Sequence, residues 1–242
     1  MNRYFCETMI KELLARKGFR WFLILYALFF VAGGFVVLFT ERGDVVLLIN
    51  RYSRLEWDST VEFLTNLGLG GYMAILAGLL VFYKLRHAAI GLLNLLAIGI
   101  FTNVFKELFK GAFTRPLHYF LYDDFPRFIY TAEINYYSSF PSGHSMTIFG
   151  MLAFFAYLAN RKSISAVLFV FAVVIGFSRI YLLQHFFVDV YAGAFLGICS
   201  LLVTLWFTGN HLPLLKRKFF DRSLQQNIRL LFPREEKTPI KS

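Results

Sequence analysis

The feature that most constrains this chain is a series of long apolar runs that contain no charged residue. Asp, Glu, Lys and Arg are missing from six stretches, which are 21–40, 63–83, 88–105, 145–160, 163–178 and 190–215. A helix of about 20 apolar residues crosses the roughly 30 Å of hydrocarbon in a bilayer, and helices satisfy their backbone polar groups internally. The sequence therefore predicts an all-α, polytopic membrane protein with six transmembrane helices in one bundle.

The composition supports this fold class and excludes others. Hydrophobic residues make up 57% of the chain and charged residues 17%, against about 45–50% and about 25% in soluble domains. This argues against a disordered chain, a soluble enzyme and a disulfide scaffold. Cys6 and Cys199 lie too far apart in sequence to suggest a metal cluster or a bridge, so they leave the redox compartment open.

The net charge of +10 has a topological explanation. Most basic residues lie in segments that share one side if the N-terminus is inside, and these are 1–20, 84–86, 161–162 and 216–241. Lys and Arg favour cytoplasmic loops and attract anionic lipid. We therefore expect both termini in the cytoplasm, anionic lipid at that face of the bilayer, and no nucleic-acid partner.

Three segments are expected along the chain. Residues 1–20 form a cytoplasmic N-terminal segment that either lies in the interface as a helix or precedes the first span without one. Residues 21–210 form the six-helix domain, and residues 211–242 form a basic, partly amphipathic cytoplasmic tail. The run at 21–40 is longer than the 7–15 apolar residues of a signal peptide, which favours a retained helix.

Under this topology, polar residues that are costly at membrane depth gather at the outer ends of the last four helices. They are Lys106, Lys110, Arg115, Ser142, His144, Arg179, His185 and Asp189. A single lysine at such a position commonly extends to the interface. Because so many converge on one level, we expect them to form a site.

The residue types indicate binding and transfer of a phosphate-like anion. Asp189 lies four residues after His185, so on a helix its carboxylate can fix one imidazole nitrogen and leave the other as base or nucleophile. The sequence Pro-Ser-Gly-His at 141–144 opens a helix, either as an amide-lined anion site or as a plain N-cap. Arg115 and Arg179 supply planar forks for phosphate oxygens. No metal site and no cofactor is predicted, since ligand clusters are not seen in the sequence.

These motifs resemble the signature of the type 2 phosphatidic acid phosphatases, also called lipid phosphate phosphatases. That signature reads Lys-x6-Arg-Pro, then Pro-Ser-Gly-His, then Ser-Arg-x5-His-x3-Asp. The second part stands at 141–144 and the third at 178–189. The first part departs from the pattern, because Arg115-Pro116 is present but position 108 is Leu. We expect Lys106 rather than Lys110 to serve, with two residues inserted before the arginine.

The resemblance implies a role for each matching residue. His185 is the nucleophile that forms a phosphohistidine, Asp189 orients it, and His144 protonates the leaving oxygen. The phosphoryl oxygens would be bound by Lys106, Arg115, Ser142, Gly143 and Arg179. The family works without a metal.

The expected function is hydrolysis of a phosphomonoester or diphosphate on a lipid headgroup, at the outer face of the cell (inner) membrane. The main alternative substrate is an isoprenyl diphosphate such as undecaprenyl diphosphate, and lipid A and phosphatidylglycerol phosphate are further candidates. A rival from another class is a phosphate or lipid transporter that binds without hydrolysis, and a weakened enzyme is a third possibility. The aromatic stretch 117–140 is either a lid over the site or an interfacial belt. The sequence leaves the individual lipid and the oligomeric state open.

Overall fold

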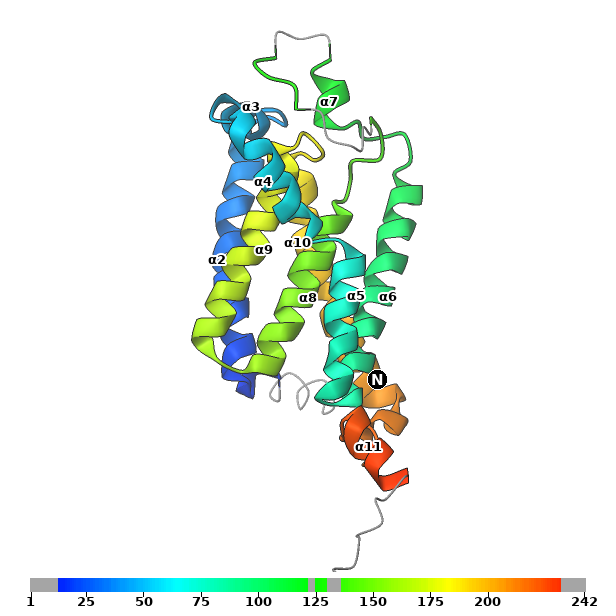
Figure 1. The fold of residues 1–242 in the computed structure, drawn as a ribbon. Helices are drawn as coiled ribbons and strands as arrows, with labels where there is room; N and C mark the ends of the chain where they lie inside the picture. The colour runs from blue at the N-terminus through cyan, green and yellow to red at the C-terminus, as the bar shows by residue number, and fades with distance from the viewer. Residues whose placement is uncertain (1–12, 122–124, 130–135, 232–242) are drawn as a thin grey trace, which may run out of the picture.

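The fold is a bundle of long apolar helices, seen in a computed structural model that describes residues 13–121, 125–129 and 136–231. Its long members are α2 (Lys17–Phe39), α6 (Leu85–Leu108), α8 (Gly143–Ala159), α9 (Lys162–Tyr181) and α10 (Phe187–His211). They run side by side along one axis (Figure 1). The described residues contain no β-strand, in agreement with the predicted all-α class.

The second predicted span is not one straight helix. It is divided into α4 (Leu55–Asn66), α5 (Gly70–Leu79) and a 3₁₀ turn η1 (Leu80–Phe82), with a bend of 49° at the break. The break contains Gly68 and is followed directly by Gly70 and Gly71. Glycine costs a helix interior about 1 kcal/mol relative to alanine, so three glycines within four residues favour a break here.

The number of spans is smaller by length and composition than the six predicted. Four described helices are long and apolar enough to cross a bilayer, and the bent pair raises this to five. The remaining candidate, α8, is apolar but has only 17 residues, which gives it a length of about 26 Å. The count of six therefore remains a prediction.

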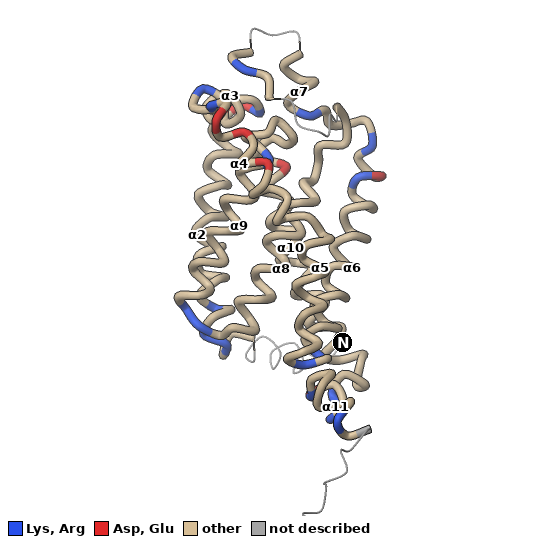
Figure 2. Tube along the Cα trace, viewed as in Figure 1, with Lys and Arg blue, Asp and Glu red and all other residues tan. Residues whose placement is uncertain are grey.

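Short helices lie at both ends of the bundle, and those within the tail at 211–242 fall in the segment expected to be partly amphipathic. At one end lie α3 (Asp44–Arg51) and α7 (Pro116–Tyr119), and at the other lie η2 (Pro213–Lys216) and α11 (Leu224–Leu231). Acidic residues gather near α3 and α4, whereas the turn between α8 and α9 carries basic residues (Figure 2). The expectation for an interfacial helix at the N-terminus falls largely on residues 1–12, and that for the end of the tail on 232–242, and both lie outside the described residues.

Glycines allow α8 and α10 to pack backbone to backbone. A Cβ at Gly150 would lie 2.8 Å from the carbonyl oxygen of Gly197, and one at Gly193 would lie 2.6 Å from the carbonyl oxygen of Ser142. Small residues permit such close approach between membrane helices. Because Gly193 stands one turn after Asp189 on α10, this packing fixes the two helix ends that carry the second and third sequence motifs.

Candidate active site

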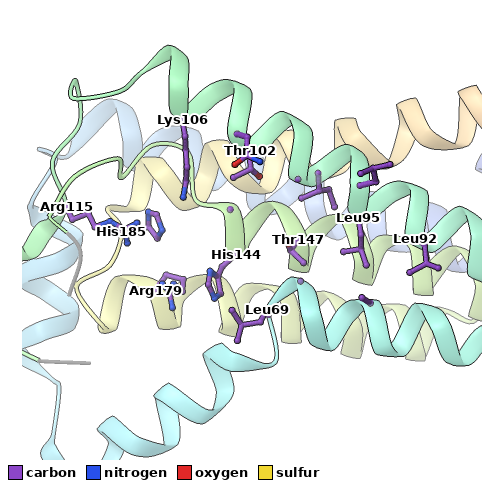
Figure 3. Close-up of a pocket in the computed structure, with 18 residues that line it drawn as sticks. Leu69, Leu92, Leu95, Thr102, Lys106, Arg115, His144, Thr147, Arg179 and His185 are labelled. Atoms are coloured by element: carbon purple, nitrogen blue, oxygen red, sulfur yellow. The ribbon is translucent and has the colours of Figure 1, made fainter. Parts of the chain in front are cut away.

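A cavity of about 640 Å³ lies between the N-terminal half of α5, residues 92–106 of α6 and the start of α8. One end is polar, and five side chains from separate segments converge on it, namely Lys106, Arg115, His144, Arg179 and His185 (Figure 3). The other end is lined by apolar residues of α5 and α6, which include Ala74, Leu92, Leu95 and Leu96. None of the described residues that line the cavity is acidic.

Lys106 and Lys110 have different surroundings. Lys106 lies in the last turn of α6 and lines the cavity. Lys110 lies beyond the end of that helix, its side chain is 70% exposed, and its Nζ is 3.0 Å from Oε1 of Glu107. The structure thus places Lys106, the lysine favoured by the sequence argument, with the other cations, and it does not place Lys110 there.

Hydrogen bonds within the protein hold both the backbone and the guanidinium of Arg115 in place. Its backbone N–H donates to the carbonyl of Tyr136 at 2.8 Å, and its Nε donates to the carbonyl of Tyr137 at 3.1 Å. Its Nη1 donates to the side-chain oxygen of Gln184 at 2.7 Å and to the Gln184 carbonyl at 3.2 Å. Arg115 as a whole is only 7% exposed, and these hydrogen bonds hold its guanidinium at the edge of the cavity.

Arg179 reaches the cavity from the last turn of α9. Its Nη1 donates to the hydroxyl of Thr65 at 3.2 Å, and both residues are buried. Thr65 belongs to α4, two residues before the break at 67–69. The bent α4–α5 pair therefore supports one of the cations directly.

His185 and Asp189 come together across the connection from α9 to α10. Nδ1 of His185 lies 3.6 Å from Oδ2 of Asp189, longer than a hydrogen bond. The same oxygen accepts the backbone N–H of Phe186 at 2.9 Å and the hydroxyl of Ser139. Catalytic contacts are often loose in the absence of substrate, so this geometry is compatible with an oriented imidazole. Burial holds the pKa of His185 below its usual range, with Asp189 opposing the shift, which keeps the imidazole neutral at pH 7.

The Pro-Ser-Gly-His sequence forms the N-cap of α8, one of the two interpretations that the sequence left open. Ser142 is a fully buried N-cap whose Oγ accepts from the backbone N–H of Ser145 at 3.3 Å and from its hydroxyl at 2.9 Å. The cavity is lined instead by Gly143 and His144. A Cβ at Gly143 would lie 3.1 Å from Thr102, so the absence of a side chain keeps this wall open.

Three polar residues in this region were missed by the sequence argument. Thr65 contacts Arg179, Gln184 contacts Arg115, and Ser139 donates to Asp189. All three are buried. No pattern in the sequence marks them, because each contacts a residue brought near by the fold. Thr65 lies outside the recognised motifs, Ser139 lies two residues before the second motif, and Gln184 stands at an unspecified position of the third.

The aromatic stretch that follows α6 is packed on the site end of the bundle. Phe120 and Phe125 stack with ring centroids 4.7 Å apart and are buried in an apolar cluster with Phe186. Arg127 forms a bidentate ion pair with Asp58 on α4, at 2.7 and 2.9 Å. The described part of the stretch is thus packed against the bundle, and Tyr122 and Tyr130 lie outside the described residues.

Comparison with known proteins decides the family. The model of the PAP2 superfamily matches residues 88–213, which is more than half of the chain and includes every residue of the three motifs. This protein belongs to the PAP2 superfamily. The resemblance to the type 2 phosphatidic acid phosphatases is thereby confirmed.

Individual members of the superfamily show how far the likeness extends. Phosphatidylglycerophosphatase B of Bacillus subtilis (strain 168) is 31% identical over 151 residues, which cover 56% of this chain and 67% of the relative. The crystal structure of Aquifex aeolicus LpxE superimposes with a TM-score of 0.60 at 25% identity, covering 69% of this chain and 96% of that one. The transmembrane PAP2 type phosphatidylglycerolphosphate phosphatase of Bacillus subtilis gives a TM-score of 0.49 at 23% identity, covering 78% and 96%.

Proposed function

We propose that this PAP2 protein is a membrane-embedded phosphatase that hydrolyses a phosphate ester on a lipid headgroup. One observation carries the proposal. Three cations and two histidines, drawn from separate segments, line the polar end of a cavity whose other end is apolar. A phosphorylated lipid has the same two halves, an anion joined to hydrocarbon.

The polar end suits a phosphoryl group that carries charge on three oxygens. Lys106, Arg115 and Arg179 would bind these oxygens, and the backbone N–H groups at the start of α8, at Gly143, would add donors. Phosphoryl transfer depends mainly on positioning and charge stabilisation. With three cations in place the protein itself neutralises the phosphate, and we propose that no metal is required.

Transfer would proceed in two steps through His185. Its Nε2 attacks phosphorus while Asp189 holds the Nδ1 side, the ester P–O bond breaks, and His144 gives a proton to the leaving oxygen. Water then attacks the phosphohistidine, the P–N bond breaks, and His144 accepts the proton of the water. Inorganic phosphate leaves, and both histidines return to their starting state.

The Ser142 hydroxyl would contribute indirectly. As the N-cap of α8 it orients Gly143 and His144 rather than facing the cavity. The sequence-based role of Ser142 as a direct phosphate ligand is the least supported of the set, because Ser142 is fully buried and does not line the cavity.

The apolar end suggests how a lipid reaches the site. Removing hydrocarbon from the bilayer costs about 0.8 kcal/mol per CH₂, so we propose that the tail stays in the membrane and enters beside α5 and α6. The similarity to phosphatidylglycerophosphatase B makes a glycerophospholipid phosphate the first candidate substrate. An isoprenyl diphosphate such as undecaprenyl diphosphate is the second, since the cations do not distinguish one phosphate from two.

We retain the three-segment division and the sidedness as part of the proposal. Residues 21–210 form the catalytic membrane domain, flanked by cytoplasmic segments 1–20 and 211–242 that contact anionic lipid. The site would then face the outside of the cell membrane. With the native cysteines replaced, Arg51→Cys on α3 should react with an impermeant thiol reagent in intact cells, and Arg161→Cys should not. The reverse pattern would move the chemistry to the cytoplasm.

The direct test is phosphate release by the purified protein in detergent micelles. Phosphatidic acid, phosphatidylglycerophosphate and undecaprenyl diphosphate would be compared, with His185→Ala as the control. Release from at least one lipid, lost in the variant, is expected. Tight binding without release from any of them would favour the transporter, for which an oriented His185–Asp189 pair has no use.

A further inference from the structure

A second apolar pocket lies on the other side of α5 from the active-site cavity. Its volume is about 360 Å³, and it lies between α5, α8 and α9. Its walls are hydrocarbon and aromatic side chains, among them Met73, Leu76, Leu152, Val167, Phe171 and Ile175. Eight residues of α9 separate Val167 from Ile175, so the pocket follows the helix for about 12 Å.

The two pockets meet at the break between α4 and α5. Leu67 lines the second pocket, and the next three residues, 68–70, line the active-site cavity. A Cβ at Gly68 would lie 2.8 Å from Cγ2 of Ile175 and 3.7 Å from Cδ2 of His144. The wall of the second pocket is therefore separated from a proposed catalytic side chain by little more than one glycine.

The start of α5 leaves room for a ligand to cross from one pocket to the other. A Cβ on Gly70 or Gly71 would find nothing within 4 Å. Both glycines lie at the first turn of α5, and Gly70 also lines the active-site cavity. The first turn of α5 therefore has unfilled space beside it, close to the point where the two pockets approach each other.

We propose that the second pocket binds the second hydrocarbon tail of a two-chain lipid phosphate, whose glycerol backbone straddles the N-terminus of α5. This inference rests on the proposed phosphatase function and narrows its substrate to the diacylglycerol phosphate class. One tail lies along α5 and α6 below the cations, and the other lies between α5, α8 and α9. A lipid with a single chain fills only the first pocket.

Continuity with the active-site cavity argues for a substrate tail rather than for bulk lipid. Bilayer lipid covers any apolar groove, but its occupancy would not depend on which substrate is being turned over. The two occupants therefore differ in one measurable quantity, the ratio of activity on two-chain and one-chain substrates. A bulky side chain in the second pocket changes that ratio only if a substrate tail occupies it.

Two valines on α9 provide a matched pair for this test. Val167 lines the second pocket and is 55% exposed, whereas Val170 is 57% exposed and is not part of its lining. We would measure kcat/KM of Val167→Trp and Val170→Trp on dioleoyl phosphatidic acid and on oleoyl lysophosphatidic acid, in the same detergent. Val167→Trp should lose about tenfold on the two-chain substrate, as expected when roughly two methylenes are displaced, and should retain its activity on the one-chain substrate. Val170→Trp should leave both unchanged.

A second pair on α5 guards against a local effect of tryptophan. Leu76 lines the second pocket and Leu79 does not, and both are exposed in the described structure. Leu76→Trp should reproduce the selective loss and Leu79→Trp should not. An unchanged ratio in both pocket variants, or equal losses on both substrates, would overturn the second-tail site. Failure of the phosphatase proposal would look different, because the unmodified protein would then release no phosphate from either lipid.

Discussion

The α8–α10 pair, whose member α8 lines the active-site cavity, and α5, which lines the same cavity, are packed in opposite ways. In α8, eleven residues are buried, and its glycine Gly150 would bring a Cβ within 2.8 Å of the backbone of α10. In α5 only Met73 and Ala77 are buried, and a Cβ on Gly70, Gly71 or Gly78 would find nothing within 4 Å. One side of the cavity is a close-packed wall and the other is an open one.

This difference matches the two tasks that the proposed function assigns to the cavity. Phosphoryl transfer requires groups held in a fixed geometry, and His144 and Asp189 stand on the close-packed pair. A lipid tail requires space beside the same groups, and the open side supplies it. The comparison therefore separates residues whose change should stop the reaction from residues whose change should alter only what enters.

The largest effect is expected from the two histidines. His185→Ala removes the proposed nucleophile and His144→Ala the proposed acid, and general acid–base groups alone contribute about 10²–10⁴-fold to rate. Both variants should lose at least that much kcat while keeping an unchanged elution profile. His211→Ala, at the far end of α10, is the matched control. Full phosphate release by His185→Ala would break the assignment of chemistry to the close-packed side.

A smaller effect separates the two lysines of the first motif. Removing one donor to a developing anion costs about 10²–10³-fold in kcat, so Lys106→Ala should lose activity in that range. Lys110→Ala should remain close to the unmodified protein, because its ammonium is exposed and paired with Glu107. Steady-state kinetics on a lipid phosphate measures both, and the opposite ranking would make Lys110 the phosphate ligand.

Thermal unfolding tests the difference in packing between α8 and α5 directly. Gly150→Ala adds a methyl group against the backbone of α10 and should destabilise the protein by about 1–3 kcal/mol. Gly78→Ala adds the same group to open space and should have a neutral or slightly stabilising effect. A clear drop in Tm for the first and none for the second is expected in one detergent. Equal Tm values would mean that the close packing of α8 on α10 does not stabilise the fold.

The smallest change is expected on removal of divalent metal. Because three cationic side chains would neutralise the phosphate, activity should be the same before and after treatment with EDTA. Loss on chelation with recovery on adding Mg²⁺ would require a metal at the polar end of the cavity, and the roles given to Lys106, Arg115 and Arg179 would need revision.

Much of the fold and the site could be predicted because their signals are local. Charge-free runs mark α2, α6, α9 and α10 within a few residues, since membrane hydrocarbon imposes one requirement on every span. The motif residues His144, Arg179 and His185 were found at fixed spacings, and the structure brings them to one cavity. Lys106 was favoured from its sequence context, and the structure places it at the same cavity.

Other features were not predictable because they depend on contacts between distant segments. A run of apolar residues does not reveal the 49° bend between α4 and α5, although the glycines at 68, 70 and 71 indicate a place where a helix is easily interrupted. Thr65 and Gln184 are ordinary polar residues until the fold brings an arginine to each. The short amphipathic helix α3 was not predicted, because eight residues span only about two helical turns and give too short a hydrophobic repeat to identify a helix.

The central claim is that His185 carries the phosphoryl group during turnover, and trapping that intermediate tests it most directly. A lipid substrate with a ³²P-labelled phosphate would be mixed with the purified protein and quenched in alkali, where phosphohistidine is stable. Label that survives alkali, is released by acid and maps to the peptide containing His185 is the predicted result, with no label in His185→Ala. Turnover by the unmodified protein with label on another residue, or undiminished turnover by His185→Ala, would contradict the account.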